Sequence, residues 1–157
     1  MNVLGVDPGQ SGGIALVTDV VSLAWKMPDT ERDVFDLLDS IIINHAYIEA
    51  VHAMPKQGVS SSFKFGQNYG FLRGCLISLH IPFEVVTPQK WQKALGCLTR
   101  GDKNVSKRKA QELYPTLKIT HATADALLIS TYGYRLREYE SPPNSGGLPR
   151  HLSTEGA

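Results

Sequence analysis

Three carboxylates occur where a charged residue is uncommon. Asp7 lies in the apolar stretch NVLGVD, Glu49 interrupts AYIEAVHA, and Asp125 directly precedes the apolar run ALLI. An acidic residue is depleted in strands and is costly to bury alone. Carboxylates held close together repel one another unless a cation lies between them, and their hard oxygen atoms suit Mg²⁺ or Mn²⁺. Two such ions can clamp a phosphodiester, activate a water molecule and stabilise the leaving oxygen.

Each acidic residue also has a simpler interpretation. Asp7 can begin a turn, Glu49 can point to solvent from a half-exposed strand, and Asp125 can interact favourably with the helix dipole. His121 lies four residues before Asp125, so a helix that includes both places them on one face, whereas in a loop the histidine has no such relation. The metal interpretation therefore requires a fold that brings the acidic residues together.

The spacing of apolar residues predicts an α/β fold. A strand at residues 3–6 and a strand at residues 14–17 flank a glycine-rich turn at residues 8–13, and further strands are expected at residues 20–27, 46–53 and 82–86. Thr30, with Asp33 three residues later, predicts a capped helix start. Further helices are expected at residues 62–80, 105–113 and 121–139. A meander of three strands that opens a mixed sheet, with helices on both faces, is the expected architecture.

Length and composition fit one globular domain, predicted at residues 1–140, followed by a disordered tail at residues 141–157 that is rich in turn-forming residues. The chain has 157 residues, of which 42% are hydrophobic and 20% charged. Two cysteines give neither a metal-binding spacing nor a disulfide framework. Without an apolar segment of membrane-spanning length or a signal segment, the expected location is a reducing cytoplasm.

The net charge of +1 conceals a strong asymmetry along the chain. Residues 1–55 carry two basic and eight acidic side chains, whereas residues 56–109 carry ten basic and two acidic ones. A nearly neutral protein with a basic middle segment is expected to have one positively charged face, which is typical of proteins that bind a polyanion such as DNA.

The ordered motifs GVDPGQSGG, IEAV and HATADALLIS resemble those of the RuvC-type Holliday junction resolvases of the RNase H-like superfamily. With EAVHAMP, PQKWQKALG and SKRKAQELYP, the sequence is especially similar to phage-encoded members over residues 1–139. The resemblance implies an RNase H-like mixed five-stranded sheet flanked by helices. It also implies that Asp7, Glu49 and Asp125 are catalytic ligands of two Mg²⁺ or Mn²⁺ ions per site.

His121 matches the family's fourth catalytic position, with a departure in spacing. In the bacterial pattern this residue lies three positions before the last aspartate, where this chain has Ala122. Both spacings reach the same helical face. By the resemblance, His121 would either bind the second metal ion or transfer a proton near the scissile phosphate.

Basic and polar residues in the middle segment are candidates for phosphate contacts, although a run of charges can also be a solvated face. The predicted DNA-binding residues are Lys56, Gln57, Ser60, Ser61, Lys64, Lys90, Lys93, Arg100, Lys103, Lys107, Arg108 and Lys109. The family has essential lysines in this region, and Lys90 or Lys93, together with Lys103, match them best. Trp91 is expected in the core rather than stacked on a base.

Aromatic residues and glycines of the helix predicted at residues 62–80 have two interpretations each. Phe63 or Phe65 could wedge into the open centre of a junction, as an aromatic residue does in the family, or both could pack the helix onto the sheet. Gly66, Gly70 and Gly74 recur every fourth residue and form a smooth stripe. The stripe predicts close packing against another helix, either in the same chain or, with a slight preference, in the second subunit of a homodimer.

The sequence therefore predicts a homodimeric, metal-dependent endonuclease that resolves four-way DNA junctions by paired nicks. A nuclease of the same fold that prefers flaps or replication forks, and a DNA-binding member without catalysis, are alternatives. An ATPase of the actin and sugar-kinase type also has an Asp-x-Gly strand, but it needs a second lobe and a second phosphate loop, which are not found in this chain. For a phage protein the work would take place in the host cytoplasm.

Overall fold

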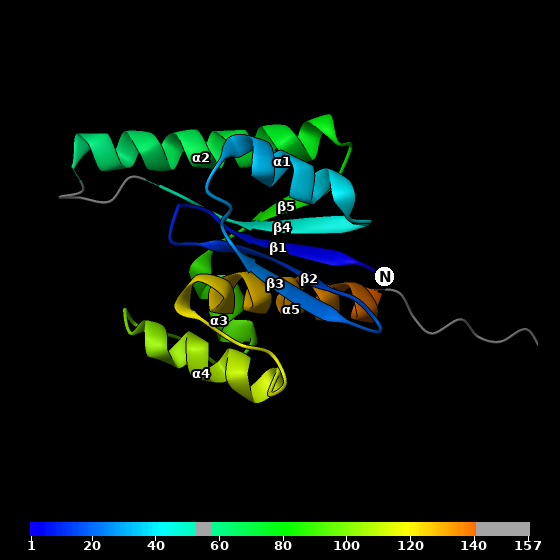
Figure 1. The fold of residues 1–157 in the computed structure, drawn as a ribbon. Coiled ribbons are helices and arrows are strands. Elements are labelled where there is room, and N and C mark those ends of the chain that lie inside the picture. Colours follow the sequence, from blue (N-terminus) through cyan, green and yellow to red (C-terminus); the bar gives the residue numbers. More distant parts are fainter. Residues whose placement is uncertain (53–57, 141–157) are drawn as a thin grey trace, which may run out of the picture.

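Five short strands form one mixed sheet in the computed structural model, which describes residues 1–52 and 58–140 (Figure 1). The order across the sheet is β3-β2-β1-β4-β5. The strands are β1 (Val3–Asp7), β2 (Gly13–Val17), β3 (Ser22–Lys26), β4 (His45–Glu49) and β5 (Phe83–Val86). The first three are antiparallel neighbours, whereas β4 runs parallel to β1 and β5 runs parallel to β4. This confirms the predicted meander and the mixed five-stranded sheet.

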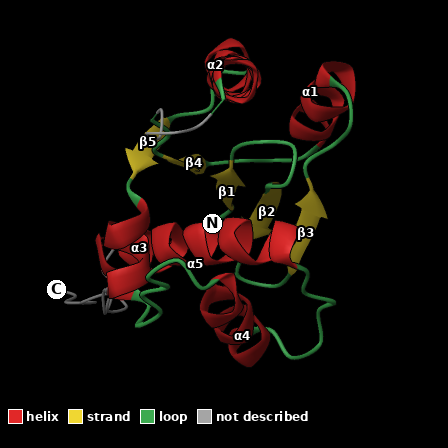
Figure 2. Ribbon diagram, turned by 90° about the vertical axis from the view of Figure 1, so that its left-hand side faces the viewer, coloured by secondary structure: helices red, strands yellow, loops and turns green. Residues whose placement is uncertain are grey.

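Helices cover both faces of the sheet (Figure 2). On one face lie α1 (Glu31–Ser40) and α2 (Val59–Ser78); on the other lies α5 (His121–Glu140), with α4 (Lys103–Leu113) packed on its outer side and α3 (Pro88–Ala94) near one end. Among the described helices, none combines the length and the apolar character that a membrane span requires.

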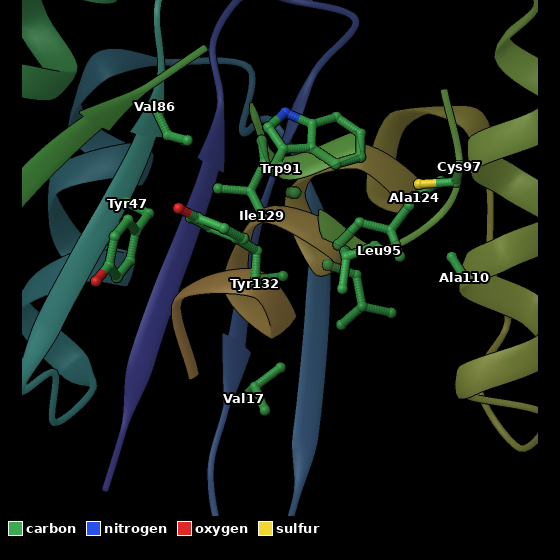
Figure 3. Packing of buried hydrophobic residues seen from close by; sticks show 14 of the residues in the cluster. Val17, Tyr47, Val86, Trp91, Leu95, Cys97, Ala110, Ala124, Ile129 and Tyr132 are labelled. Carbon is green, nitrogen blue, oxygen red and sulfur yellow. The ribbon is translucent and has the colours of Figure 1, made fainter. Parts of the chain in front are cut away.

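Alternation along the strands separates the apolar residues into two cores. Leu4, Val6 and Ile48 face α1 and α2, whereas Val3 and Tyr47 face α5. Figure 3 shows part of the α5-side core, in which the large rings of Tyr47, Trp91 and Tyr132 pack with aliphatic side chains. By this alternation, Asp7 and Glu49 belong to the face of the sheet that α5 covers.

Helix α5 approaches β1 unusually closely. A methyl group at Gly5 would collide with backbone atoms of Ala126 and Ser130, so only glycine fits at this crossing. The buried Ser130 hydroxyl donates a hydrogen bond of 2.7 Å to the Val3 carbonyl oxygen. These contacts fix the position of α5, and therefore of Asp125, relative to β1.

The predicted elements differ from the structure mainly at their ends. The Thr30 hydroxyl accepts from the Asp33 backbone N–H at 3.1 Å, which confirms the predicted cap of α1. The third strand is shorter than predicted, β4 ends at Glu49 rather than at residue 53, and α2 begins at Val59 rather than at residue 62. Helix α3 was not predicted because it is short, although Pro88 at its first position is a common start signal. The tail predicted at residues 141–157 lies outside the described residues.

Candidate active site

The acidic residues singled out by the sequence lie on three elements that meet at one edge of the sheet. Val6 of β1 is paired with Ile48 of β4 in parallel register, so the next residues, Asp7 and Glu49, are neighbours at the carboxyl ends of the two strands. Asp125 lies in the second turn of α5, the helix that packs on β1. The parallel pairing and the close packing of α5 therefore bring together carboxylates that are separated by 42 and 76 positions in the sequence.

Burial raises the pKa values of the three carboxylates, and mutual repulsion adds to the shifts of Asp7 and Glu49. Burial, followed by the charges of Glu49 and Asp125, holds the pKa of Asp7 well above its usual range. Burial also raises the pKa of Glu49 to about 7, with a further contribution from Asp125, although the Trp91 hydrogen bond and the Lys103 charge oppose the shift. A carboxylate cluster of this kind is destabilised in its ionised form unless a cation is bound.

Asp125 has an unsatisfied oxygen in this cluster. Its Oδ1 atom is buried and has no hydrogen-bond partner within residues 1–52 and 58–140. Burial raises the pKa of Asp125, whereas the Ser106 hydroxyl, Lys103 and His121 lower it. A buried acceptor without a partner costs free energy, and such atoms are rare in folded proteins. The orphaned oxygen is therefore available to a ligand.

The chemistry of these side chains suits a divalent cation, but their present orientations do not form a closed ligand set. Within residues 1–52 and 58–140, no three Asp, Glu, His or Cys side chains are arranged closely enough to hold one metal ion. Carboxylate oxygens are the ligands that Mg²⁺ and Mn²⁺ prefer. Binding at this cluster therefore requires the carboxylates to turn towards a shared ion.

His121 and Lys103 lie beside the cluster and contribute positive charge. His121 is the exposed first residue of α5, one helical turn before Asp125, and its charge lowers the pKa of Asp125. Lys103 is the first residue of α4, and its charge acts on Asp7, Glu49 and Asp125 alike. The charge of Lys103 therefore lies near enough to the carboxylates to lower the pKa of each of them.

The other predicted DNA-binding residues extend away from the cluster on α2, α3 and α4. Lys90 and Lys93 are exposed on α3, and Arg100 is exposed in the α3–α4 loop. Lys107, Arg108 and Lys109 lie on α4, where Lys109 forms an ion pair of 3.0 Å with Glu112. Ser60, Ser61 and Lys64 are exposed in the first turns of α2. Lys56 and Gln57 lie outside the described residues.

A groove of about 690 Å³ lies beside these α2 residues but across the sheet from the carboxylates. Ser61 and Lys64 line it together with Phe65, and its opposite wall includes Met27 and Val34 of the core under α1 and α2. Large size alone does not make this groove the reactive site, because the charged cluster lies on the other face.

The structure distinguishes between the two wedge candidates. The Phe65 ring lies against Gly9, whose φ of 105° belongs to the left-handed region, and a methyl group at Gly9 would meet the ring at 2.7 Å. Asn68, one turn later, accepts from the Gly9 backbone N–H at 2.7 Å. Phe65 therefore holds α2 to the β1–β2 turn, whereas Phe63 is 67% exposed and is the candidate that remains accessible.

No helix of the described part of the chain covers the glycine stripe of α2. Methyl groups added at Gly66, Gly70 or Gly74 would meet no atom within 4 Å outside the local helix backbone. Phe63 and Ile77, which lie on the same side by helical spacing, are also exposed. The alternative that the stripe packs against a helix of the same chain is therefore wrong for the described residues.

Sequence reasoning missed the polar partner of Glu49. Trp91 is fully buried, as predicted for a core residue, and the base-stacking alternative is wrong. Its Nε1–H nevertheless donates a 2.7 Å hydrogen bond to Glu49 Oε2. The one available signal was a tryptophan just after the strand predicted at residues 82–86, although the sequence did not indicate that this strand pairs with the strand of Glu49. Ser106, which lowers the pKa of Asp125, had no signal in the sequence.

Solved structures resemble this arrangement of strands and helices. RuvC of Thermus thermophilus superposes with a TM-score of 0.65 and 16% sequence identity, over 87% of this chain and 97% of that chain. RuvC of the same organism in complex with a Holliday junction substrate gives a TM-score of 0.62 and 18% identity, over 87% and 96% of the two chains. The chain has the RuvC fold. At these identities the likeness to RuvC concerns the fold alone.

The likeness to RuvC is structural only. No protein-family model matches the chain, and no curated protein matches it. The RuvC fold confirms the predicted RNase H-like sheet flanked by helices, whereas the roles of Asp7, Glu49, His121 and Asp125 remain predictions.

Proposed function

We propose that the chain is a divalent-metal-dependent endonuclease that resolves four-way DNA junctions by paired nicks as a homodimer. The proposal rests above all on one observation: Asp7, Glu49 and Asp125 meet at one edge of a sheet with the RuvC fold. Acidic residues that are distant in sequence and costly to place together are expected where a site needs them.

Asp7, Glu49 and Asp125 would hold Mg²⁺ or Mn²⁺, two ions per site. When bound, the ions would polarise the scissile phosphodiester and make a water molecule nucleophilic. Lys103 would bind a non-bridging phosphate oxygen, because its positive charge acts on all three carboxylates. His121, exposed at the start of α5, would hold or transfer a proton at the reacting oxygen or complete the ligand set.

The basic residues of α3 and α4 would bind the arms of the junction. Phosphate contacts supply most of the affinity for DNA and do not depend on its sequence. Five basic residues lie on α3, on α4 and in the loop between these helices: Lys90, Lys93, Arg100, Lys107 and Arg108. Lys103, at the start of α4, belongs to the same segment. Exposed Phe63 would contact the open centre of the junction.

A homodimer would supply the second active site that symmetrical resolution needs. A twofold axis pairs the same surface of each subunit, and a flat helix face without side chains suits such pairing. The uncovered α2 stripe of Gly66, Gly70 and Gly74, with Phe63 and Ile77 beside it, is the proposed contact. The similarity of EAVHAMP, PQKWQKALG and SKRKAQELYP to phage-encoded members further favours a phage enzyme that acts in the host cytoplasm.

The experiment that tests the function compares labelled four-way junction, Y-fork, flap and linear duplex, each with and without Mg²⁺. We expect symmetrical nicks in the junction with Mg²⁺ only, and none from Asp7→Asn, which should still bind the junction. Preferential cutting of forks or flaps would instead favour a debranching nuclease. Junction binding without cleavage, with or without Mg²⁺, would identify a DNA-binding protein without catalysis.

A further inference from the structure

Trp91 combines complete burial with a single polar contact, and that contact is to Glu49. Its exposed fraction is 0%, and it lies in the α5-side core with Val86, Leu95 and Ile129. In Figure 3 the indole nitrogen lies on the edge of the ring that faces away from Leu95 and Ile129. The nitrogen donates to Glu49 Oε2 at 2.7 Å. A buried indole needs one acceptor, and here the acceptor is a carboxylate of the proposed site.

The chain path explains how Trp91 reaches Glu49. Strand β5 is paired with β4 so that Val86 lies beside Glu49. Thr87 follows the strand as the N-cap of α3, and Pro88 opens the helix at the position where a proline costs no hydrogen bond. Trp91 follows one turn later, so α3 turns its indole back over the end of β4. The contact is thus built from rigid neighbouring elements rather than from a loop.

We propose that Trp91 is a positioning residue that fixes one oxygen of Glu49 and leaves the other oxygen for a metal ion. This inference rests on the proposed function, in which Glu49 is a ligand. An indole is suited to the task because it has one donor and no acceptor, so it can hold a carboxylate but cannot bind the cation itself. Its packed ring sets the direction of the N–H bond, as partners behind metal ligands commonly do.

The decisive variant is Trp91→Phe, which keeps an aromatic ring in the core and removes the N–H group. Trp25→Phe is the matched control, because Trp25 lies on β3 and is the other of the chain's two tryptophans. We expect Mn²⁺ binding, measured by calorimetry without DNA, to weaken about 10–100-fold in Trp91→Phe and to stay unchanged in Trp25→Phe. The Mn²⁺ concentration for half-maximal junction cleavage should rise in parallel.

A spectroscopic measurement tests the contact with an intact Trp91. In Trp25→Phe the only remaining tryptophan is Trp91, and its emission should be quenched as paramagnetic Mn²⁺ fills the site. The quenching should saturate at the concentration found by calorimetry and disappear in Asp125→Asn. This measurement stands even if Trp91→Phe fails to fold.

The possible failures are distinguishable. If the wild-type chain binds no Mn²⁺, or Asp125→Asn binds it equally well, the proposed metal site is wrong and this inference falls with it. If the wild type binds Mn²⁺ at a site that requires Asp125, the proposed function stands. In that case, the positioning role alone is overturned if folded Trp91→Phe binds Mn²⁺ with unchanged affinity. It is also overturned if Mn²⁺ does not quench the emission of Trp91.

Discussion

Replacing Glu49 with glutamine should stabilise the metal-free protein while it removes the proposed activity. Burial is the main cause that raises the pKa of Glu49 from 4.5 to about 7. The folded chain therefore holds this proton more tightly than the unfolded chain does. Stability contributed by this group is complete below about pH 4.5 and is lost as the pH rises to about 7. The glutamine has no charge to lose and can still accept from Trp91 through its amide oxygen.

The size of the effect follows from the shift. At 1.36 kcal/mol per pKa unit, ionisation of Glu49 in the metal-free chain costs about 3 kcal/mol of unfolding free energy above pH 7. For a protein of this size that corresponds to roughly 6–12 °C in melting temperature. Glu49→Gln should therefore gain this amount relative to wild type between pH 4.5 and pH 8. Relief of the Glu49 charge on Asp7 acts in the same direction.

The assay is thermal or urea unfolding in EDTA at several pH values, repeated with excess Mg²⁺. Wild type should lose stability towards pH 8 in EDTA and recover it with Mg²⁺. Glu49→Gln should lose about 3 kcal/mol less than wild type in EDTA, because only Asp7 and Asp125 still ionise there, and it should cut no junction. Asp39→Asn, an exposed carboxylate of α1, is the control that should follow wild type. If Glu49→Gln gains no stability relative to wild type as the pH rises, the buried acidic cluster does not exist in solution.

Three further substitutions test the packing and the charges. Gly5→Ala should destabilise the chain by about 3 kcal/mol or more in urea unfolding, because the methyl group meets the backbone of Ala126; a smaller loss would mean that α5 lies farther from β1. Gly70→Ala should stabilise the isolated chain by about 0.5–1 kcal/mol in the same assay yet weaken self-association in sedimentation, and unchanged association would exclude the stripe as the dimer contact. Lys103→Ala should slow single-turnover junction cleavage far more than it weakens junction binding, whereas exposed Lys118→Ala should alter neither; equal effects of the two lysines would contradict the placement of Lys103 at the site.

The sequence by itself determined most of the elements, α3 excepted, and the identity of the acidic residues. Apolar alternation marked the strands, and Thr30 with Asp33 marked the start of α1, because periodicity and capping are local properties of the chain. Asp7 and Glu49 were recognisable because a charge inside an apolar strand conflicts with the local pattern, and such conflicts are expected at functional sites.

Tertiary structure alone decided which side chains meet. The hydrogen bond between Trp91 and Glu49 joins residues 42 positions apart, and it depends on the pairing of β4 with β5 and on the turn into α3. Tertiary structure also decided between the two phenylalanines. Phe65 packs against Gly9 of the distant β1–β2 turn, whereas Phe63 is exposed. Residue type and spacing specify how a segment folds, whereas contacts between distant segments depend on the register and packing of the whole sheet.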